Sequence, residues 1–230
     1  MATARLPTCA THVVSIAIVC SGFISCRKSE PPARVVPQTK FYRVSGPDYW
    51  GDYGAVLIQG YVGERPDGGL DVRRTGPFIP PITFPFASDG EIVVTDEFKK
   101  ELEAAGISRL GFRKVVKKRI VDIPWRDWDL STPLPEGLPD SELGDPDDLL
   151  DRPHSQQAAD ALGDLWQVIL DDALVNQAEP PLRVGSKNQV WNGDAIFRDR
   201  DHQPVVTDRG KGWLEEHVGM WVRFHELKSE

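Results

Sequence analysis

Cysteine is nearly absent from this chain. The only three cysteines among its 230 residues, Cys9, Cys20 and Cys26, lie within the first 26 positions. The rest of the chain therefore has no thiol that could form a disulfide, bind a metal ion or act as a nucleophile. The five histidines show no HExxH spacing, and no zinc ligand set is complete without cysteine. We expect no metal site and no other cofactor, and the acids and histidine of 199–202 are only a weak alternative for calcium.

Motifs for nucleophilic catalysis and for phosphate binding are missing too. The sequence contains no G-x-S-x-G elbow, no G-x-x-x-x-G-K-[ST] loop and no G-x-G-x-x-G loop. Ser155 follows His154, but adjacent residues at the start of a helix do not face each other, so Ser155 is better interpreted as a helix cap. We expect no catalytic residue and no enzyme activity. The enzyme alternative rests on His202 or His217 with nearby acids.

Basic residues are outnumbered by acidic ones. The chain has 27 Lys and Arg against 35 Asp and Glu, a formal net charge of −8. Binding to a phosphate backbone needs clustered basic residues, so we expect no nucleic acid partner. An acidic body is compatible with a basic protein partner. The seven tryptophans predict large aromatic anchors in a core or an interface.

The N-terminus resembles a bacterial lipoprotein signal. Residues 13–25 form an apolar run that is too short to span a bilayer comfortably but has the length of a signal-peptide core. Residues 1–26 would be the signal segment ending at Cys26, which would be lipidated, and 27–39 would be a tether rich in proline and charge. Membrane contact would then occur only through Cys26. The alternative is that residues 1–35 are a misassigned start, which would leave the protein in the cytoplasm.

One segment occurs twice. Residues 93–115 and 205–227 align without a gap and share eight residues: Val93/Val205, Val94/Val206, Thr95/Thr207, Asp96/Asp208, Lys99/Lys211, Leu102/Leu214, Glu103/Glu215 and Phe112/Phe224. Each copy reads as a strand, a capped helix and a second strand. The sequence therefore predicts an α+β protein with mixed sheets and two pseudo-repeated β-α-β units.

The other expected elements surround these two units. Strands are expected at 40–45, 54–62 and 70–75, while the prolines of 76–86 limit that segment to an extended surface position. A long amphipathic helix is expected after a cap at Ser155, with Ala158, Leu162, Leu165, Ile169 and Ala173 on its apolar face. The chain would thus comprise an N-terminal half at 40–130, an acidic, proline-rich loop at 131–153, and a C-terminal half at 154–230.

Two runs of charge have alternative interpretations. Five basic residues crowd one expected strand, and seven acids without a base lie between Glu136 and Asp151. Both runs are usually solvated surface. The basic run could instead meet an acidic partner, and the acidic loop could dock onto a basic protein such as a nuclease, whose nucleic acid it would mimic. The basic residues are Arg113, Lys114, Lys117, Lys118 and Arg119.

Taken together, four segments resemble immunity proteins of bacterial polymorphic toxin systems. They are KFYRV at 40–44, the two repeated segments, and WNGDAIF at 191–197. The resemblance implies a non-catalytic protein that binds and blocks a cognate toxin. Related proteins often carry paired CxxC motifs in the first half, which this chain lacks, so no metal knuckle is carried over.

The predicted function is therefore neutralisation of a cognate protein toxin, such as a basic nuclease, by direct contact. Alternatives are a surface lipoprotein with a structural or scaffolding role, resting on Cys26, and less favoured an enzyme. The acidic loop supplies the charged contact candidates, and two tryptophans are possible aromatic anchors, although packing in the core is at least as good an interpretation for them. The candidates are Asp140, Glu142, Asp145, Asp147, Asp148, Asp151, Trp125 and Trp128.

Overall fold

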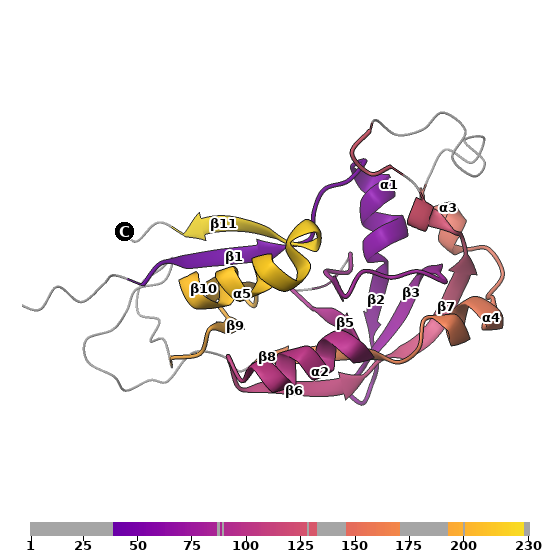
Figure 1. The fold of residues 1–230 in the computed structure, drawn as a ribbon. Coiled ribbons are helices and arrows are strands. Elements are labelled where there is room, and N and C mark those ends of the chain that lie inside the picture. Colours follow the sequence, from indigo (N-terminus) through magenta and orange to yellow (C-terminus); the bar gives the residue numbers. More distant parts are fainter. Residues whose placement is uncertain are drawn as a thin grey trace, which may run out of the picture. The chain divides into compact units, whose positions relative to one another are not determined.

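The computed structural model describes residues 39–132 apart from 87, 89 and 128, residues 146–170, and residues 193–227 apart from 200. These residues fall within one compact unit, Gln38–Glu230. Three sheets and several short helices make up the described part, so the predicted α+β class is confirmed (Figure 1).

The second repeated segment builds a four-stranded antiparallel sheet with a strand from the start of the fold. The repeat forms β10 (Pro204–Thr207), α5 (Asp208–Val218) and β11 (Arg223–Leu227). Strand β1 (Phe41–Ser45) is inserted between β10 and β11, and β9 (Ile196–Arg198) pairs with β10 to complete the order β11-β1-β10-β9. The predicted β-α-β unit is confirmed, but its two strands are separated by β1.

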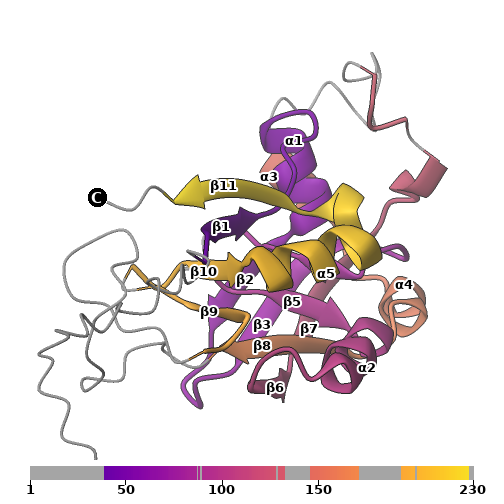
Figure 2. The same cartoon turned by 60° about the vertical axis from the view of Figure 1, so that its left-hand side comes forward.

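The first repeated segment builds a second sheet of the same design. It forms β5 (Val93–Thr95), α2 (Asp96–Ala105) and β6 (Leu110–Lys114). Strand β8 (Leu165–Leu170) lies between β5 and β6, and the short β4 (Ile82–Thr83) pairs with β5, which gives the order β4-β5-β8-β6. Each helix packs against strands of its own sheet (Figure 2).

The strand register shows that the duplication is larger than the repeated sequence. Val94 faces Trp166 in the first sheet, and its counterpart Val206 faces Tyr42 in the second. The pair Phe112↔Val168 likewise corresponds to Phe224↔Val44. Strands β8 and β1 are therefore equivalent, although β8 follows its repeat in the chain and β1 precedes its own.

The shared residues make the same contacts twice, beginning at the helix caps. The hydroxyl of Thr95 accepts a hydrogen bond from the Phe98 amide, as the hydroxyl of Thr207 does from the Gly210 amide. Side-chain caps of this kind stabilise a helix by about 1 kcal/mol. The repeated Val-Thr-Asp thus ends a strand and begins a helix in both units.

The next shared residue, aspartate, receives a hydrogen bond from the inserted strand. The indole of Trp166 donates to Asp96 Oδ1 at 3.0 Å, and the hydroxyl of Tyr42 donates to Asp208 Oδ1 at 3.1 Å. A hydrogen bond from Lys100 lowers the pKa of Asp96, so this acceptor stays charged. These bonds fasten each inserted strand to its helix.

In each unit the shared lysine lies over an aromatic ring of the inserted strand. Lys99 Nζ is 4.1 Å from the ring centre of Trp166, and Lys211 Nζ is 5.4 Å from that of Tyr42. The two lysines also pair with their shared glutamates, at 3.5 Å for Glu103 and 2.6 Å for Glu215. Cation–π attraction and an i,i+4 ion pair thus explain two of the shared positions, the lysine and the glutamate.

Both units contribute to one hydrophobic core. The largest cluster joins Leu102 of α2 to Leu214 and Val218 of α5. The rings of Phe98 and Trp213 meet directly, with centres 5.7 Å apart. Because the two helices share this cluster, it joins the two sheets. A smaller cluster of Phe41, Phe197 and Val205 lies on the second sheet alone.

A third sheet and its covering helices lie outside the repeats. The hairpin β2 (Tyr61–Glu64) and β3 (Leu70–Gly76) is joined by β7 (Val116–Asp122), which runs parallel to β3. The prediction of a strand at 54–62 was wrong for its first part, where α1 (Asp52–Gly54) and the π-helix η1 (Ala55–Gln59) occur. Val56, Leu57 and Ile58 are consecutively buried, and such a short apolar run fits a buried helix as well as a strand.

The predicted long helix after Ser155 is also wrong. Ser155 does cap a helix, but α4 (Gln156–Ala161) has only six residues. Gly163, at φ +65°, turns the chain, and the next residues form β8 in the middle of a sheet. Leu165 and Ile169, expected on one helical face, instead occupy a strand, where pairing with two neighbours overrides the helical spacing.

The acidic loop contains an element that was not expected. Residues Pro146–Leu150 form the short helix α3, whose Leu149 and Leu150 are buried against η1 and β7. Beyond Gly76 the 76–86 segment forms only the edge strand β4, which fits the limit set by its prolines, but Ile82 and Thr83 of β4 are buried, whereas Phe86 is exposed. Two 3-10 turns complete the described fold, η2 (Trp125–Asp127) and η3 (Gly219–Trp221).

Candidate functional site

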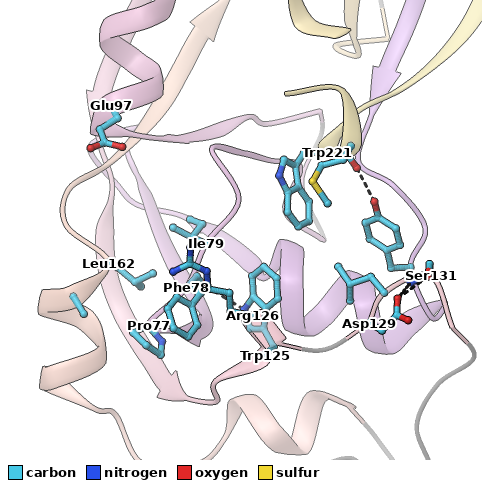
Figure 3. A pocket seen from close by; sticks show the side chains of 14 residues that line it. Pro77, Phe78, Ile79, Glu97, Trp125, Arg126, Asp129, Ser131, Leu162 and Trp221 are labelled. Carbon is cyan, nitrogen blue, oxygen red and sulfur yellow. Dashed lines mark hydrogen bonds between the residues drawn. The ribbon is translucent and has the colours of Figure 1, made fainter. Parts of the chain in front are cut away.

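A cleft of about 740 Å³ opens where segments far apart in the sequence meet. Its walls come from the loop after β1, the start of 76–86, the end of α4, the η2 region and η3 (Figure 3). Aromatic and aliphatic side chains predominate, and three charged side chains line it. The residues used below are Tyr49, Phe78, Glu97, Trp125, Arg126, Asp129, Met220 and Trp221.

Three aromatic rings form the wall at one end. The ring of Trp221 lies 6.1 Å from that of Tyr49 at an angle of 81°, and 6.0 Å from that of Trp125 at 77°. Hydrogen bonds hold this arrangement, because the Trp125 indole donates to the carbonyl of Phe78 and the Tyr49 hydroxyl donates to that of Met220. Near-perpendicular rings with satisfied polar groups make a preformed aromatic surface.

The turn η3 presents an exposed large apolar side chain to the cleft. Met220 is 58% exposed, and Trp221 beside it is half-buried. This turn lies between α5 and β11, so it is held at both ends by the second repeated unit. Aromatic residues, methionine and arginine are enriched in protein interfaces, so the residue types at this end favour contact with another protein.

The three charged residues of the cleft make different contacts. Ser131 donates hydrogen bonds to Asp129 Oδ1 from its hydroxyl at 2.5 Å and its amide at 3.0 Å, and these bonds lower the pKa of Asp129. The guanidinium carbon of Arg126 lies 5.3 Å from the ring centre of Phe78. Glu97 is exposed in the first turn of α2, at the other end of the cleft from Asp129 (Figure 3).

The predicted aromatic anchors have different positions. Trp125 is 4% exposed, so it forms the buried base of the aromatic wall rather than a projecting anchor. Trp128 lies outside the described residues, as do Asp140, Glu142, Asp145 and Cys26. Sequence inspection missed Tyr49, Met220 and Trp221, because nothing in a linear sequence brings these three together.

The remaining acidic candidates lie on or beside α3, away from the residues that line the cleft. Asp151 accepts from Arg73 at 2.7 Å and from Arg119 at 2.8 Å, so it is engaged within the fold. Asp147 accepts from the hydroxyl of Tyr61 at 2.7 Å and is exposed. Asp148 is exposed too, and no side-chain partner for it occurs among the described residues.

The basic side chains of β6 and β7 bond to neighbouring groups of the fold. Lys114 pairs with Asp164 at 2.8 Å, and Lys118 pairs with Asp71 at 3.1 Å. Lys117 donates to carbonyl groups at the end of α4, and Arg113 donates to the carbonyl of Gly68. These contacts favour the interpretation of a charged surface strand over that of a patch for an acidic partner.

The histidine and acid candidates for other chemistry also have structural roles. Asp199 caps the β9–β10 turn, where its Oδ1 accepts from the amides of Asp201 and Gln203 at 2.9 and 2.8 Å. The ring of His217 stacks on Trp213 at 4.1 Å, at the end of α5. Within the described ranges, no group of three His, Cys, Asp or Glu side chains is placed to hold a metal ion.

Ser155 and His154 bond to different groups. The Ser155 hydroxyl accepts from the Ala158 amide at 3.2 Å, which confirms the predicted cap. His154 Nδ1 accepts from the Ile120 amide at 3.0 Å, so this nitrogen carries no proton.

The longest described helix, α5, has 11 residues, and none of the helices in the described part is long and apolar enough to cross a membrane. No protein-family model, curated protein or solved structure matches the chain.

Proposed function

We propose that this chain is a non-catalytic binding protein that neutralises a cognate bacterial toxin by direct protein–protein contact. The observation that carries the proposal is the aromatic cleft of about 740 Å³, with its preformed wall and exposed Met220. A toxin segment seated there would bury apolar surface against Trp221 and Tyr49. Such central, well-packed pockets usually supply most of the binding energy of an interface.

The acidic helix α3 adds a second, weaker contribution to the proposal. Asp147 and Asp148 are exposed, and Asp151 lies beside them. Exposed charges of one sign mainly accelerate association with a partner of opposite charge and add little affinity at physiological salt. We therefore propose that α3 accelerates association with the toxin and that the cleft supplies the affinity. This arrangement is compatible with a basic toxin such as a nuclease.

The test is a rescue assay with a matched pair of variants. The full chain is co-expressed with the product of the neighbouring upstream gene, and survivors are counted. The proposal expects that the neighbour kills and that the full chain restores growth. It also expects that Met220→Glu abolishes rescue, while Val116→Glu preserves it, because Val116 is a comparably exposed apolar residue (44%) outside the cleft. A harmless neighbour, or one that kills regardless of the full chain, would overturn the proposal.

The same variants test whether the cleft is the binding site, independently of whether the protein neutralises a toxin. Both positions are exposed, so both variants should retain the wild-type melting temperature. Rescue by Met220→Glu at wild-type efficiency would remove the cleft from the interface. Substituting Asn for Asp147, Asp148 and Asp151 together tests the acidic helix, and an unchanged association rate at low salt would exclude its steering role.

We also propose that the protein is lipidated at Cys26 and thereby located at a membrane. The supporting feature is the apolar run of 13–25, which ends in one small residue, Ser25, directly before Cys26. Metabolic labelling with a palmitate analogue should mark the full chain, and Cys26→Ser should abolish both the label and recovery in the membrane fraction. A chain that stays unlabelled and soluble would support the misassigned start at 1–35 and a cytoplasmic protein.

A further inference from the structure

We propose that the chain consists of two tandem modules that exchange their first strands, and that the same exchange joins two copies of the chain when the protein folds at high concentration. In the joined form, β1 of one copy lies between β10 and β11 of the other. The partner is a second copy of this chain, and the surface that receives it is the slot between β10 and β11. This inference is independent of the proposed function.

The order of elements along the chain places β8 with the second repeat. The first module is β1, β4, β5, α2 and β6, and the second is β8, β9, β10, α5 and β11. Both modules begin with the inserted strand, continue with a short edge strand, and end with the repeated strand, helix and strand. One tandem duplication explains this common order. Grouping β8 with the first repeat would instead require the inserted strand to follow one repeat and precede the other.

The short strands β4 and β9 extend the equivalence of the modules. The isoleucine that begins each of them pairs with the valine just before the shared threonine. The Thr95 amide donates to the carbonyl of Pro81 at 3.1 Å, and the Thr207 amide donates to that of Ala195 at 3.0 Å. All five elements therefore correspond between the modules, in the same chain order.

Each inserted strand bonds to the helix of the other module. Trp166 of the second module donates to Asp96 of the first, and Tyr42 of the first donates to Asp208 of the second. The shared lysines likewise lie over an aromatic ring of the other module. Exchange of one strand between two equivalent modules is the arrangement of a domain-swapped dimer, here within a single chain. Neither module completes its own sheet, because β1 and β8 each fill the slot of the other.

Strand β1 is placed to enter another copy. It stands at the N-terminal end of the compact unit Gln38–Glu230, so within that unit only the segment after Ser45 connects it to the rest. This segment contains a strained residue, because Trp50 has a φ of +54°, a left-handed conformation that side chains of this size rarely adopt. Opening the segment would release the strain, and short hinge loops under strain favour domain swapping.

Exchange between copies preserves the contacts of β1. In the monomer β1 fills the slot between β10 and β11 (Figure 2). The slot offers the same backbone ladder, the acceptor Asp208 and the facing Val206 and Phe224 to β1 of either copy. Within one copy, the hinge holds β1 near the slot at an effective concentration of about millimolar. Dilute protein should therefore be monomeric, and dimers should form when folding takes place near that concentration.

The first experiment refolds the full chain from denaturant at protein concentrations from about 1 µM to about 1 mM. The mass of the product is measured by light scattering after size exclusion. Dimers should appear toward the millimolar end, and each tenfold rise in monomer concentration should raise the ratio of dimer to monomer about tenfold. A chain that stays monomeric over the whole range would overturn exchange between copies.

A pair of introduced cysteines identifies the strand that crosses. Arg43 of β1 faces Val205 of β10. The Thr207 amide is directed toward the chain before β9, and the backbone of Val205, two residues earlier, points the same way, so this pair is not hydrogen-bonded to β1. Such pairs have Cα atoms about 4.5 Å apart, within the range of a disulfide. Serine replaces the native cysteines in all of these variants, namely Cys9, Cys20 and Cys26.

One copy carries Arg43→Cys and the other carries Val205→Cys, and the two are refolded together near millimolar concentration and oxidised. Because Val205 is fully buried, only β1 of one copy in the slot of the other brings the two thiols together. We expect a covalent dimer whose disulfide joins these two positions, identified by peptide mass spectrometry. The matched control is one chain with both substitutions, which should close the same disulfide within a monomer when folded in dilute solution.

Two other results would count against the proposal. A wild-type dimer without this disulfide in the mixed copies, or one linked only through two Arg43→Cys thiols, would mean that the copies associate without exchanging β1. Failure of the control chain to close its disulfide would mean that β1 does not lie beside β10 in solution. The register from which the exchange is inferred would then be wrong.

Discussion

The shared core predicts that the two repeated units unfold together. The perturbation is Leu214→Ala in α5, the counterpart of Leu102 in α2. Leu214 is 2% exposed and belongs to the same cluster as Leu102 and Phe98. Removing its side chain leaves a cavity that faces both helices. We therefore expect destabilisation of the first unit by a substitution that lies wholly in the second.

The magnitude follows from the burial of the leucine. Replacing a fully buried leucine by alanine lowers the free energy of unfolding by about 2–5 kcal/mol. For a domain of this size, each kcal/mol shifts the melting temperature by about 2–4 °C. The variant should therefore melt roughly 4–20 °C below the wild type, in a single transition. Met220→Ala, on the adjacent turn but exposed, should change the free energy of unfolding by no more than about 0.5 kcal/mol.

The assay is native-state hydrogen exchange followed by mass spectrometry. Peptides that cover α2 and β5 should lose as much protection as peptides that cover α5 and β10, because both report the same global opening. If Leu214→Ala accelerates exchange in α5 alone while α2 keeps its protection, the units unfold independently. That result would refute the argument that the cluster couples them.

Three further predictions test single contacts. The hydrogen bond from Lys100 lowers the pKa of Asp96. The charged Asp96 therefore stabilises the fold above its unfolded pKa of about 3.9, and this stabilisation is lost as pH falls through the folded pKa. Asp96→Asn should melt below wild type at pH 7 and at the same temperature as wild type in acid. Burial lowers the pKa of Arg74 to about 9, so Arg74→Met should leave the denaturant midpoint unchanged or higher, and a loss above about 3 kcal/mol would show that its hydrogen bonds to the carbonyls of Ile58 and Thr75 outweigh the burial of its charge. Gly106→Ala, at φ +55°, should destabilise by about 1 kcal/mol, whereas Gly219→Ala, at φ −50° with open space around it, should be neutral or stabilising in the same thermal melts.

The duplicated units were predictable because their key contacts are local. The threonine cap, the lysine–glutamate pair and the contact of that lysine with the shared phenylalanine all fall within one segment, so selection for them leaves a gap-free repeat. The equivalence of β1 and β8 was not predictable. Between FYRV at 41–44 and LWQV at 165–168 only the valine is identical, and the two strands stand on opposite sides of their repeats.

The two wrong element assignments have one physical origin. Residues 165–170 follow a helical spacing of apolar side chains, yet they sit between β5 and β6, where a strand satisfies backbone groups on both sides. The apolar run of η1 reads as a strand, yet its carbonyls are met by side chains of β3. Arg74 donates to Ile58 O at 2.7 Å, and Thr75 donates to Leu57 O. In both cases tertiary partners overrode the local pattern.

The candidate site lies at a turn where the two repeated units make different contacts. The turn after α2 carries Ser108 and Arg109, which bind the Ile196 amide at 2.7 Å and Asp194 at 3.4 Å and so join the first unit to the second. In the aligned turn after α5, Met220 and Trp221 occupy these two positions and face the cleft instead. A structural contact in one unit is thus replaced in the other by an exposed methionine and a half-buried tryptophan that packs against the core. Stability gives a reason for the tryptophan but none for the methionine, because an exposed methionine gains little from folding. Divergence at this one turn is therefore the strongest reason to look for the partner there.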